Sequence, residues 1–304
     1  PARGLMGKPA PPDSPAQTTC PPAALTGAWG AQPEDPETAF LLDDETFSLV
    51  WNGTLAGRAR ILACAQEDAG QRVDVCDQGV RRSYRFEPAE DGWRVVLPPM
   101  GLDVEAVSVR RLAAVPAVFD PRPFPIPPPQ PLPPERIEEL RAELERRREV
   151  DQAVRRGSFD ELDWEEMRRI DEANTAFLKE LVTEVGWIDR ERFGDLAAGA
   201  AWLFVQHSDD VPLMMGALPR VKEHGSPGHY ALLHDRLALR LGGEQRYGSQ
   251  LQRTPEGTWA LAPIETLEGI DELRASMGLS TLKENFARFP DGVAPETVEV
   301  LSCE

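Results

Sequence analysis

The stretch PAVFDPRPFPIPPPQPLPP, residues 116–134, decides how this chain is organised. About half of its residues are proline, which has a fixed φ and no backbone N–H, so the stretch cannot form the interior of a helix or a sheet. Such a run is extended, polyproline-like and fairly stiff. It predicts a boundary between two structural units, and we interpret it as a spacer.

The residues before this linker predict a β domain over 23–115. Short segments with strand-like patterns are separated by turn pairs such as Asn52-Gly53 and Asp91-Gly92. Roughly seven strands over about 90 residues predict an antiparallel meander, curled into a barrel or half-barrel. The segments span 39–42, 46–51, 59–65, 72–76, 81–87, 93–97 and 104–112.

The start of the β domain carries a short motif. Leu25-Thr26-Gly27-Ala28-Trp29 resembles the Gly-x-Trp start of lipocalin-like small barrels, which bind many kinds of molecule or none. The alternative interpretation is structural: Trp29 plugs one end of the barrel. Residues 1–22, rich in proline, alanine and small polar residues, predict a flexible tether.

The residues after the linker predict a mainly helical domain. Residues 135–159 are expected to form a solvated connecting helix, because their Glu and Arg residues fall at i, i+4 spacing. The next helix should begin after Asp163 and end at Gly186, a natural C-terminal cap. The chain is thus predicted to be an α+β protein of two domains, with 160–289 as the helical domain and 290–304 as a tail. Further helices are expected at about 195–207, 211–223, 228–241, 268–277 and 281–287, with a small β-hairpin between 242 and 261.

The charge of the chain excludes some partners. Asp and Glu number 51 against 33 Lys and Arg, which gives a formal net charge of −18. We expect no nucleic-acid partner, because phosphate contacts need clustered Lys and Arg. No run approaches the roughly 18 apolar residues of a spanning helix, so no transmembrane segment is predicted. No Gly-rich phosphate loop and no Cys-x-x-Cys occur, and no cofactor is expected.

Four cysteines bear on the compartment. If a hairpin centres on Gly70, Cys64 and Cys76 lie directly opposite each other, and we predict a disulfide between them. Cys20 and Cys303, near the two chain ends, could form a second bridge. An even count with one local pair indicates an oxidising compartment, so we expect an exported protein, periplasmic or extracellular, whose signal peptide is no longer present. The alternative is four unrelated thiols in a cytosolic protein.

Several separated motifs in the helical domain resemble one known family. Over about residues 160–289 the chain is similar to an uncharacterised bacterial domain-of-unknown-function family, number 6624. This resemblance implies domain limits and a set of residues, but it names no reaction. The motifs are Arg169-Ile170-Asp171-Glu172-Ala173-Asn174-Thr175, Gly186-Trp187, Ala201-Trp202-Leu203-Phe204-Val205-Gln206-His207-Ser208-Asp209, Asp235-Arg236, Gln245-Arg246-Tyr247-Gly248-Ser249-Gln250 and Gly278-Leu279.

Polar residues of these motifs form the candidate site. We predict His207, Asp209 and Asp235 as catalytic residues, because a carboxylate beside His207 (Asp209 or Asp210) could orient its ring and raise its basicity. Arg236 could hold a carboxylate or phosphate through two hydrogen bonds. The predicted ligand-binding residues are Asp171, Asn174, Gln206, Arg236, Gln245, Tyr247 and Gln250.

Each of these residues also has a structural interpretation. His207 at a helix C-terminus is electrostatically favoured there, and Asp209 can cap the N-terminus of the next helix. Asp235 and Arg236 can form an ion pair. All four histidines fall between 207 and 234, but no His-Glu-x-x-His occurs, so no metal site is predicted.

Three functions remain open from the sequence. The main hypothesis is an exported envelope protein whose helical domain binds a partner protein or a small ligand. The alternatives are a hydrolase that uses His207 with Asp209 or Asp210, and a structural spacer. A hydrolase requires His207, Asp235, Tyr247 and Gln250 to line one concave pocket, whereas a binding or scaffold protein buries them in separate hydrogen bonds.

Overall fold

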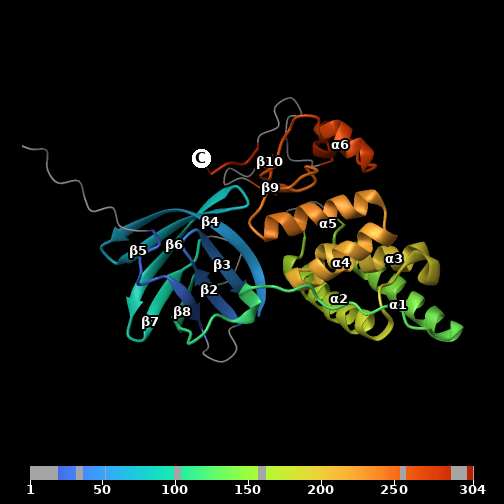
Figure 1. Cartoon of the computed structure of the whole chain (residues 1–304), viewed down its shortest axis with the longest axis horizontal. Helices are drawn as coiled ribbons and strands as arrows, with labels where there is room; N and C mark the ends of the chain where they lie inside the picture. The colour runs from blue at the N-terminus through green and yellow to red at the C-terminus, as the bar shows by residue number, and fades with distance from the viewer. Residues whose placement is uncertain are drawn as a thin grey trace, which may run out of the picture.

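A computed structural model describes residues 20–31, 37–51, 53–98, 104–156, 162–253, 258–288 and 300–303. Figure 1 shows a β-barrel beside a group of helices, with a small hairpin (β9 and β10) above them and α6 on the side of the helices. Most of the predicted N-terminal tether, Asn52 of one predicted turn, and most of the predicted C-terminal tail lie outside the described residues.

The N-terminal part is a closed barrel of eight antiparallel strands. Each strand pairs with the next, and β8 pairs back onto β1. The predicted barrel-like meander is therefore confirmed, and the seven predicted segments correspond to β2–β8. The sequence did not predict β1 as a strand, because it is only four residues long and two of them are glycines. The strands are β1 Gly27–Gly30, β2 Thr38–Leu42, β3 Thr46–Trp51, β4 Thr54–Glu67, β5 Gly70–Asp77, β6 Val80–Ala89, β7 Gly92–Val96 and β8 Ala106–Arg111.

Aromatic and branched side chains fill the barrel. Trp29 is buried, its indole N–H donates to the carbonyl of Leu25 at 2.7 Å, and the Arg111 guanidinium lies over its ring. Successive side chains of a strand point to opposite faces of the sheet, and the core side chains lie on the inner face. The core includes Phe40, Leu42, Phe47, Val73, Val75, Tyr84, Phe86 and Val95.

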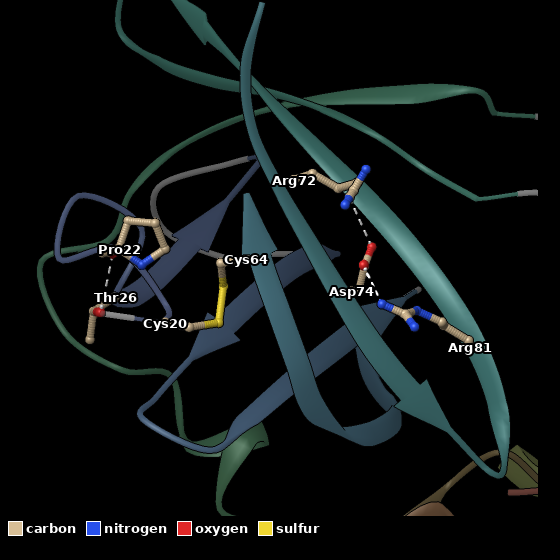
Figure 2. The surroundings of a disulfide bond; sticks show 7 residues. All are labelled: Cys20, Pro22, Thr26, Cys64, Arg72, Asp74 and Arg81. Atoms are coloured by element: carbon tan, nitrogen blue, oxygen red, sulfur yellow. Dashed lines mark hydrogen bonds and ion pairs between the residues drawn. A yellow bond between two sulfur atoms is a disulfide. The ribbon is translucent and has the colours of Figure 1, made fainter. Parts of the chain in front are cut away.

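The disulfides differ from the predicted pairing. Cys20 is bonded to Cys64, and Cys76 is bonded to Cys303. Figure 2 shows the first bridge, which ties the segment before β1 to β4. The expectation that all four cysteines are paired holds, but the predicted Cys64–Cys76 and Cys20–Cys303 bridges are wrong.

The register of the β4–β5 hairpin explains this error. Glu67 pairs with Gly70, so the turn is the two residues between them and the hairpin does not centre on Gly70. In this register Cys64 lies opposite Val73, and Cys76 lies elsewhere on the sheet. A shift of one residue changes every cross-strand pair.

The C-terminal part contains seven α-helices and a two-stranded sheet among its described residues. The helix that starts after Asp163 and ends at Gly186 is confirmed, and the Asp163 side chain caps it. Asp210, and not Asp209 as predicted, caps the helix that follows His207. The elements are α1 Pro134–Ala153, α2 Trp164–Val185, α3 Arg190–His207, α4 Val211–His224, α5 Pro227–Arg240, β9 Leu251–Arg253, β10 Trp259–Leu261, α6 Ile270–Ser276 and α7 Leu282–Phe286.

The proline-rich linker packs along the helices. Its first part forms a short 3₁₀ helix, η1 (Ala117–Phe119), whose Phe119 is buried against the barrel. Further on, the N–H of Phe124 donates to the carbonyl of Pro212 at 2.8 Å, and the side chains of Phe124, Ile126 and Leu132 pack against the helical core. The linker is thus part of the helical core as well as the connection between the two parts.

The two parts of the chain contact each other. Arg240, the last residue of α5, donates through Nη1 to the carbonyl of Ala56 on β4 at 2.6 Å. Cys303 is bonded to Cys76 on β5, and Leu301 N–H donates to the carbonyl of Leu261 on β10 at 2.8 Å. Figure 1 shows this C-terminal segment between β10 and the barrel. In the described part of the chain, no helix combines the length and the apolar character needed to cross a membrane.

Candidate functional site

A pocket of about 1200 Å³ lies between the barrel and the helices; we call it the interdomain pocket. Its barrel wall includes Phe47, Leu49, Ala59 and Tyr84, which belong to the barrel core. Its helical wall carries polar groups of α2 at i, i+4 and i+8, the residues around the end of α3, and Arg240. The polar groups of this wall include Asp171, Thr175, Lys179, His207, Ser208, Asp209, Asp210 and Arg240.

His207 is oriented by a buried carboxylate from a distant helix. Its Nδ1 lies 3.0 Å from Oδ1 of Asp151 on α1, and the Asp151 side chain is 0 % exposed. An ionised carboxylate only accepts hydrogen bonds, so Nδ1 carries the hydrogen; in the neutral form of the ring, Nε2 then keeps the lone pair. The predicted partners, Asp209 and Asp210, are not the residues that bind the ring.

Arg155 holds the carboxylates beside His207. Its guanidinium pairs with Asp151 at 3.1 Å and with Asp171 of α2. Burial opposes the ionisation of Asp151, but the hydrogen bond and charge of His207 and the charge of Arg155 outweigh it, so the pKa of Asp151 lies below its ordinary value. Burial raises the pKa of Asp171 despite its pairing with Arg155.

The same group was tested as a metal site. One oxygen or nitrogen from each of Asp151, Asp171 and His207 lies within 4.8 Å of the others. The guanidinium of Arg155 already contacts both carboxylates, so a metal ion would have to displace a bound cation. The donor set therefore fits an internal ion pair better than a metal ion, and we propose no metal here.

Two basic residues that line the interdomain pocket pair with carboxylates. Lys179 Nζ lies 2.6 Å from Oδ2 of Asp210, and Arg240 pairs with Asp209. Arg236, one turn before Arg240, is partly buried, and desolvation, together with the charge of Arg240, lowers its pKa to about 10. Its Nε has no hydrogen-bond partner among the described residues.

Two other predicted ligand-binding residues are buried outside the pocket lining. Asn174 on α2 accepts from Arg147 at 3.2 Å, whereas its Nδ2 has no partner in the described structure. Gln206 is 4 % exposed, and its Oε1 also lacks a partner there. Neither side chain reaches the interdomain pocket, although Asp171 and His207 on the same helices do.

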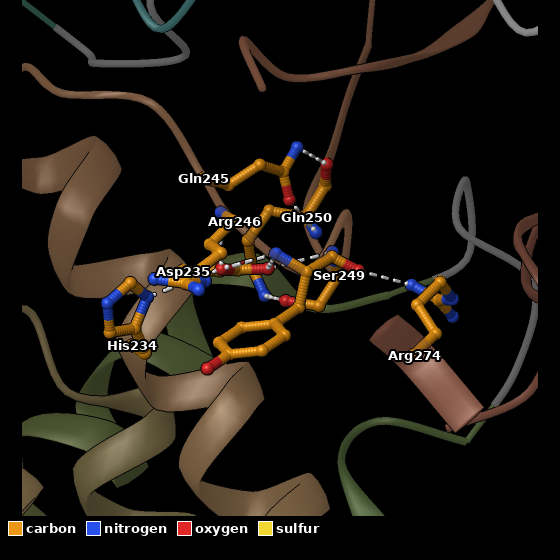
Figure 3. Close-up of polar contacts among 8 residues, drawn as sticks. His234, Asp235, Gln245, Arg246, Ser249, Gln250 and Arg274 are labelled. Atoms are coloured by element: carbon orange, nitrogen blue, oxygen red, sulfur yellow. Dashed lines mark hydrogen bonds and ion pairs between the residues drawn. The ribbon is translucent and has the colours of Figure 1, made fainter. Parts of the chain in front are cut away.

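Asp235 binds the loop that follows α5, away from the interdomain pocket, as Figure 3 shows. Its carboxylate is 0 % exposed and accepts the backbone N–H groups of Arg246 at 2.8 Å, Tyr247 at 3.0 Å and Ser249 at 3.0 Å. His234 Nδ1 lies 3.5 Å away. Three charge-assisted hydrogen bonds fix the loop after α5, which is a structural role.

The glutamines of the same loop bind its backbone. Gln245 donates to the carbonyls of Gln250 and Ala262 at 3.0 and 2.8 Å, and accepts from the N–H of Gln250 at 2.8 Å. Tyr247 is 7 % exposed, and Arg274 donates to its carbonyl at 2.8 Å. The side chains of Gln245 and Arg274 thus bind the backbone of this loop.

The predicted site is therefore divided between two places. His207, Asp209 and Asp171 lie at the interdomain pocket, whereas Asp235, Gln245, Tyr247 and Gln250 do not line it. The convergence required of the hydrolase hypothesis is not observed for this second group. Successive residues of a helix point in directions about 100° apart, so neighbours such as Asp235 and Arg236 serve different surroundings.

Residues 134–294, just over half of the chain, match a family described as "Family of unknown function (DUF6624)". The chain belongs to this family. The DUF6624 region begins at α1, so the helix that the sequence suggested as a connection lies inside it, and the barrel lies outside it. The comparisons with curated proteins and with solved structures give no match.

The DUF6624 region holds the residue that sequence reasoning missed. Asp151 lies in a segment interpreted as a solvated helix, yet it shares one face with the buried Leu140 and Leu144, which precede it by eleven and seven residues. An acidic residue on the apolar stripe of a charged helix is the signal that could have identified it. The barrel wall of the pocket has no comparable signal in the sequence, because its apolar residues follow the same pattern as the other residues of the barrel core.

Proposed function

We propose that this protein is exported and binds a small molecule with an apolar body and a polar end in the interdomain pocket. One observation carries the proposal: a single pocket has barrel-core side chains on one wall and the His207 group on the other. Ligand sites in proteins are concave, mostly apolar, and contain a few placed polar groups.

The apolar wall supports an apolar ligand body. An eight-stranded barrel has an interior that side chains can just fill, or that can hold one small ligand. Phe47, Leu49 and Tyr84 belong to the barrel core and also line the pocket. On the opposite wall, Trp164 is 45 % exposed and lines the same pocket with Met167. An apolar ligand would cover these surfaces, with a gain of about 25 cal/mol for each Å² removed from water.

The polar wall supports a ligand end that forms hydrogen bonds. His207 is 19 % exposed at the pocket, and Asp151 holds its ring from behind. Because Nδ1 donates to Asp151, Nε2 can accept a hydrogen bond from a hydroxyl or amide of the ligand.

The disulfides support the proposal that the protein is exported. All four cysteines are paired in two bridges, and one of them joins residues 227 positions apart. Disulfides persist in oxidising compartments and are rare in the cytosol. Alkylation of free thiols in intact source cells, followed by mass spectrometry, should find all four cysteines unmodified; alkylated cysteines would contradict export.

The binding proposal is tested with a pair of tryptophan substitutions on α2. Ala176 and Ala173 are both exposed, but Ala176 lines the interdomain pocket and Ala173 does not. The probe is anilinonaphthalene sulfonate, which has an apolar ring system and a charged end and fluoresces when shielded from water. Ala176→Trp should weaken its binding by about tenfold or more, a loss of about 1.4 kcal/mol, and Ala173→Trp should leave binding unchanged.

The two tryptophan variants show whether the probe binds in the interdomain pocket. Weakened binding for Ala176→Trp alone supports the interdomain pocket as the site. Equal binding by the two variants, or a wild-type protein that binds no probe, would overturn the proposal. Unfolding curves of both variants show whether the substitutions leave the fold intact.

A further inference from the structure

We propose that His207 is a general base in the interdomain pocket and that the protein hydrolyses an ester of an apolar carboxylic acid. This inference rests on the proposed ligand pocket and names the chemistry that takes place there. Its basis is the relationship between a buried carboxylate, an imidazole and a pocket with an apolar wall.

The first step of the argument is the orientation of the ring. Asp151 is 0 % exposed, and Arg155, just beyond the end of the same helix, pairs with it, so the carboxylate is held in place. It accepts the Nδ1 hydrogen of His207 at 3.0 Å. The ring therefore has a fixed tautomer with its free Nε2 lone pair, and its residue lines the pocket. A base oriented by a third group is the arrangement that activates nucleophiles in many hydrolases.

The second step concerns charge. Eight charged groups come from the end of α1, from α2, from the turn after α3 and from α5; four of them are carboxylates and four are cations. On the barrel side Glu37, Asp77 and Arg82 also line the pocket, as do Arg168 and Glu172 of α2. When the ring gains a proton, Asp151 is the carboxylate that stabilises the imidazolium. The eight groups are Asp151, Arg155, Asp171, Lys179, Asp209, Asp210, Arg236 and Arg240.

The third step identifies the nucleophile as water. Ser208 follows His207 directly, but it is 1 % exposed and its hydroxyl accepts the N–H of Asp210 at 2.9 Å. Although Ser208 borders the pocket, its side chain is almost completely buried and its oxygen stabilises the turn, so we assign the attack to water. A water molecule between Nε2 and the substrate needs only the base.

The reaction balances without any further reactant. Nε2 of His207 takes a proton from water, and the oxygen of that water bonds to the carbonyl carbon as the carbonyl electron pair moves onto oxygen. The tetrahedral intermediate then expels the alcohol oxygen, which takes the proton back from the imidazolium. Ester and water become acid and alcohol, and His207 returns to its starting form.

The pocket walls indicate the substrate class. The barrel wall offers hydrocarbon surface to an acyl chain. Arg240 lines the pocket. Its Nη1 donates to the carbonyl of Ala56 and its Nη2 donates to the carboxylate of Asp209. A guanidinium has five N–H donors, so donors remain for the oxygen on which negative charge develops.

The test uses p-nitrophenyl decanoate, with p-nitrophenyl acetate for comparison. His207→Gln removes the base, and His224→Gln is the matched control, because His224 also lies beside a carboxylate, Glu223, but outside the pocket. His207→Gln should lower kcat by about 10²-fold or more with KM within about threefold. His224→Gln should leave both unchanged, and decanoate should be the better substrate.

Asp151 is tested as a positioning residue. Asp151→Asn should lower kcat and change the tautomer of His207, which the imidazole nitrogen shifts in NMR spectra report. Circular dichroism checks that this variant folds; if it does not, the signals of His207 in the wild-type protein still report whether Nδ1 carries the hydrogen. A neutral ring protonated at Nε2, or full kcat in folded Asp151→Asn, would overturn the role of Asp151.

The other outcomes separate this inference from ligand binding. If the wild-type protein binds anilinonaphthalene sulfonate in the pocket but cleaves neither ester above the buffer rate, the general-base proposal is wrong and the binding proposal stands. Equal losses in His207→Gln and His224→Gln also overturn it. If Ala176→Trp blocks the probe but spares hydrolysis, the ester is cleaved elsewhere and the inference fails.

Discussion

The carbonyl oxygen of Phe124 occupies the space where a side chain at Gly216 would begin. A Cβ at Gly216 would lie 2.2 Å from that oxygen, closer than any real contact. The proline-rich linker therefore fits against α4 only because this helical position has no side chain. The linker that separates the two parts in sequence is thereby fixed to one of them in space.

Alanine substitutions at two helical glycines test this fit. Gly216→Ala should lower the free energy of unfolding by about 1–3 kcal/mol, because the linker or the helix must move. Gly199 on α3 is the control: nothing lies within 4 Å of an added Cβ there, so Gly199→Ala should stabilise by about 0.5–1 kcal/mol through helix propensity. Urea unfolding measures both, and a stabilised Gly216→Ala variant would contradict the packing described.

Asp235 is predicted to be a stability residue. In the wild-type protein three backbone N–H groups donate to the Asp235 carboxylate. Asp235→Asn replaces one carboxylate oxygen with an NH₂ group that cannot accept these bonds, so the free energy of unfolding should fall by about 2–4 kcal/mol. Amide hydrogen exchange at residues 246, 247 and 249 should accelerate. Asp195→Asn, at a side chain that is 81 % exposed, should change stability by less than about 0.5 kcal/mol. If Asp235→Asn behaved like this control, the loop would not depend on the carboxylate.

Asp74 on the barrel gives the stability a pH dependence. Burial opposes its ionisation, but hydrogen bonds from Ser83 and Arg81 and the charge of Arg72 outweigh it and hold the pKa of Asp74 below the ordinary 3.8. Figure 2 shows Asp74 between the two arginines. A folded-state pKa below the unfolded value means that this stabilisation is present above about pH 4 and is lost as the pH falls through the folded pKa.

The lowered pKa of Asp74 sets the expected effect of replacing this residue. Asp74→Asn should unfold about 1–2 kcal/mol more easily at pH 5 and at pH 7, and the difference from wild type should shrink below about pH 4. Asp91→Asn is the control, because that carboxylate is 66 % exposed and pairs only with Arg110 among the described residues. Urea unfolding at several pH values measures both; a difference that grew in acid would contradict the assignment.

The disulfide pairing is open to direct mapping. Non-reducing peptide mass spectrometry should find Cys20 linked to Cys64 and Cys76 linked to Cys303. The second bridge closes a loop of 227 residues, for which chain entropy predicts on the order of 5 kcal/mol, although measured values are commonly about 2–4. The double variant Cys76→Ser, Cys303→Ser should therefore lose about 2–4 kcal/mol of unfolding free energy. A peptide that links Cys64 to Cys76 would show that the pairing is wrong.

Local signals in the sequence determined much of the architecture. The proline run placed the boundary between the two parts, Asp163 and Gly186 marked the ends of α2, and alternating apolar residues marked seven strands of the barrel. Each of these signals acts within a few residues, through fixed φ values, caps and turn chemistry, so a single chain is enough to detect it.

The sequence located only part of the candidate site. His207 and Asp171 were predicted and do line the interdomain pocket, because polar groups that end or interrupt an apolar helix stand out in the pattern. The sequence grouped Asp235 with them, but Asp235 does not line the pocket. Its carboxylate accepts hydrogen bonds from the loop that follows α5. Sequence motifs do not distinguish a polar group that binds a ligand from one that binds backbone.

Only the tertiary structure decided which residues meet. Asp151 reaches His207 across 56 positions, Cys76 pairs with Cys303 across 227, and barrel-core residues form one wall of a pocket whose other wall is helical. These contacts depend on the register of a hairpin and on the packing of elements far apart in the chain. Local propensities carry no information about such distances, whereas the packed structure fixes them within a few ångströms.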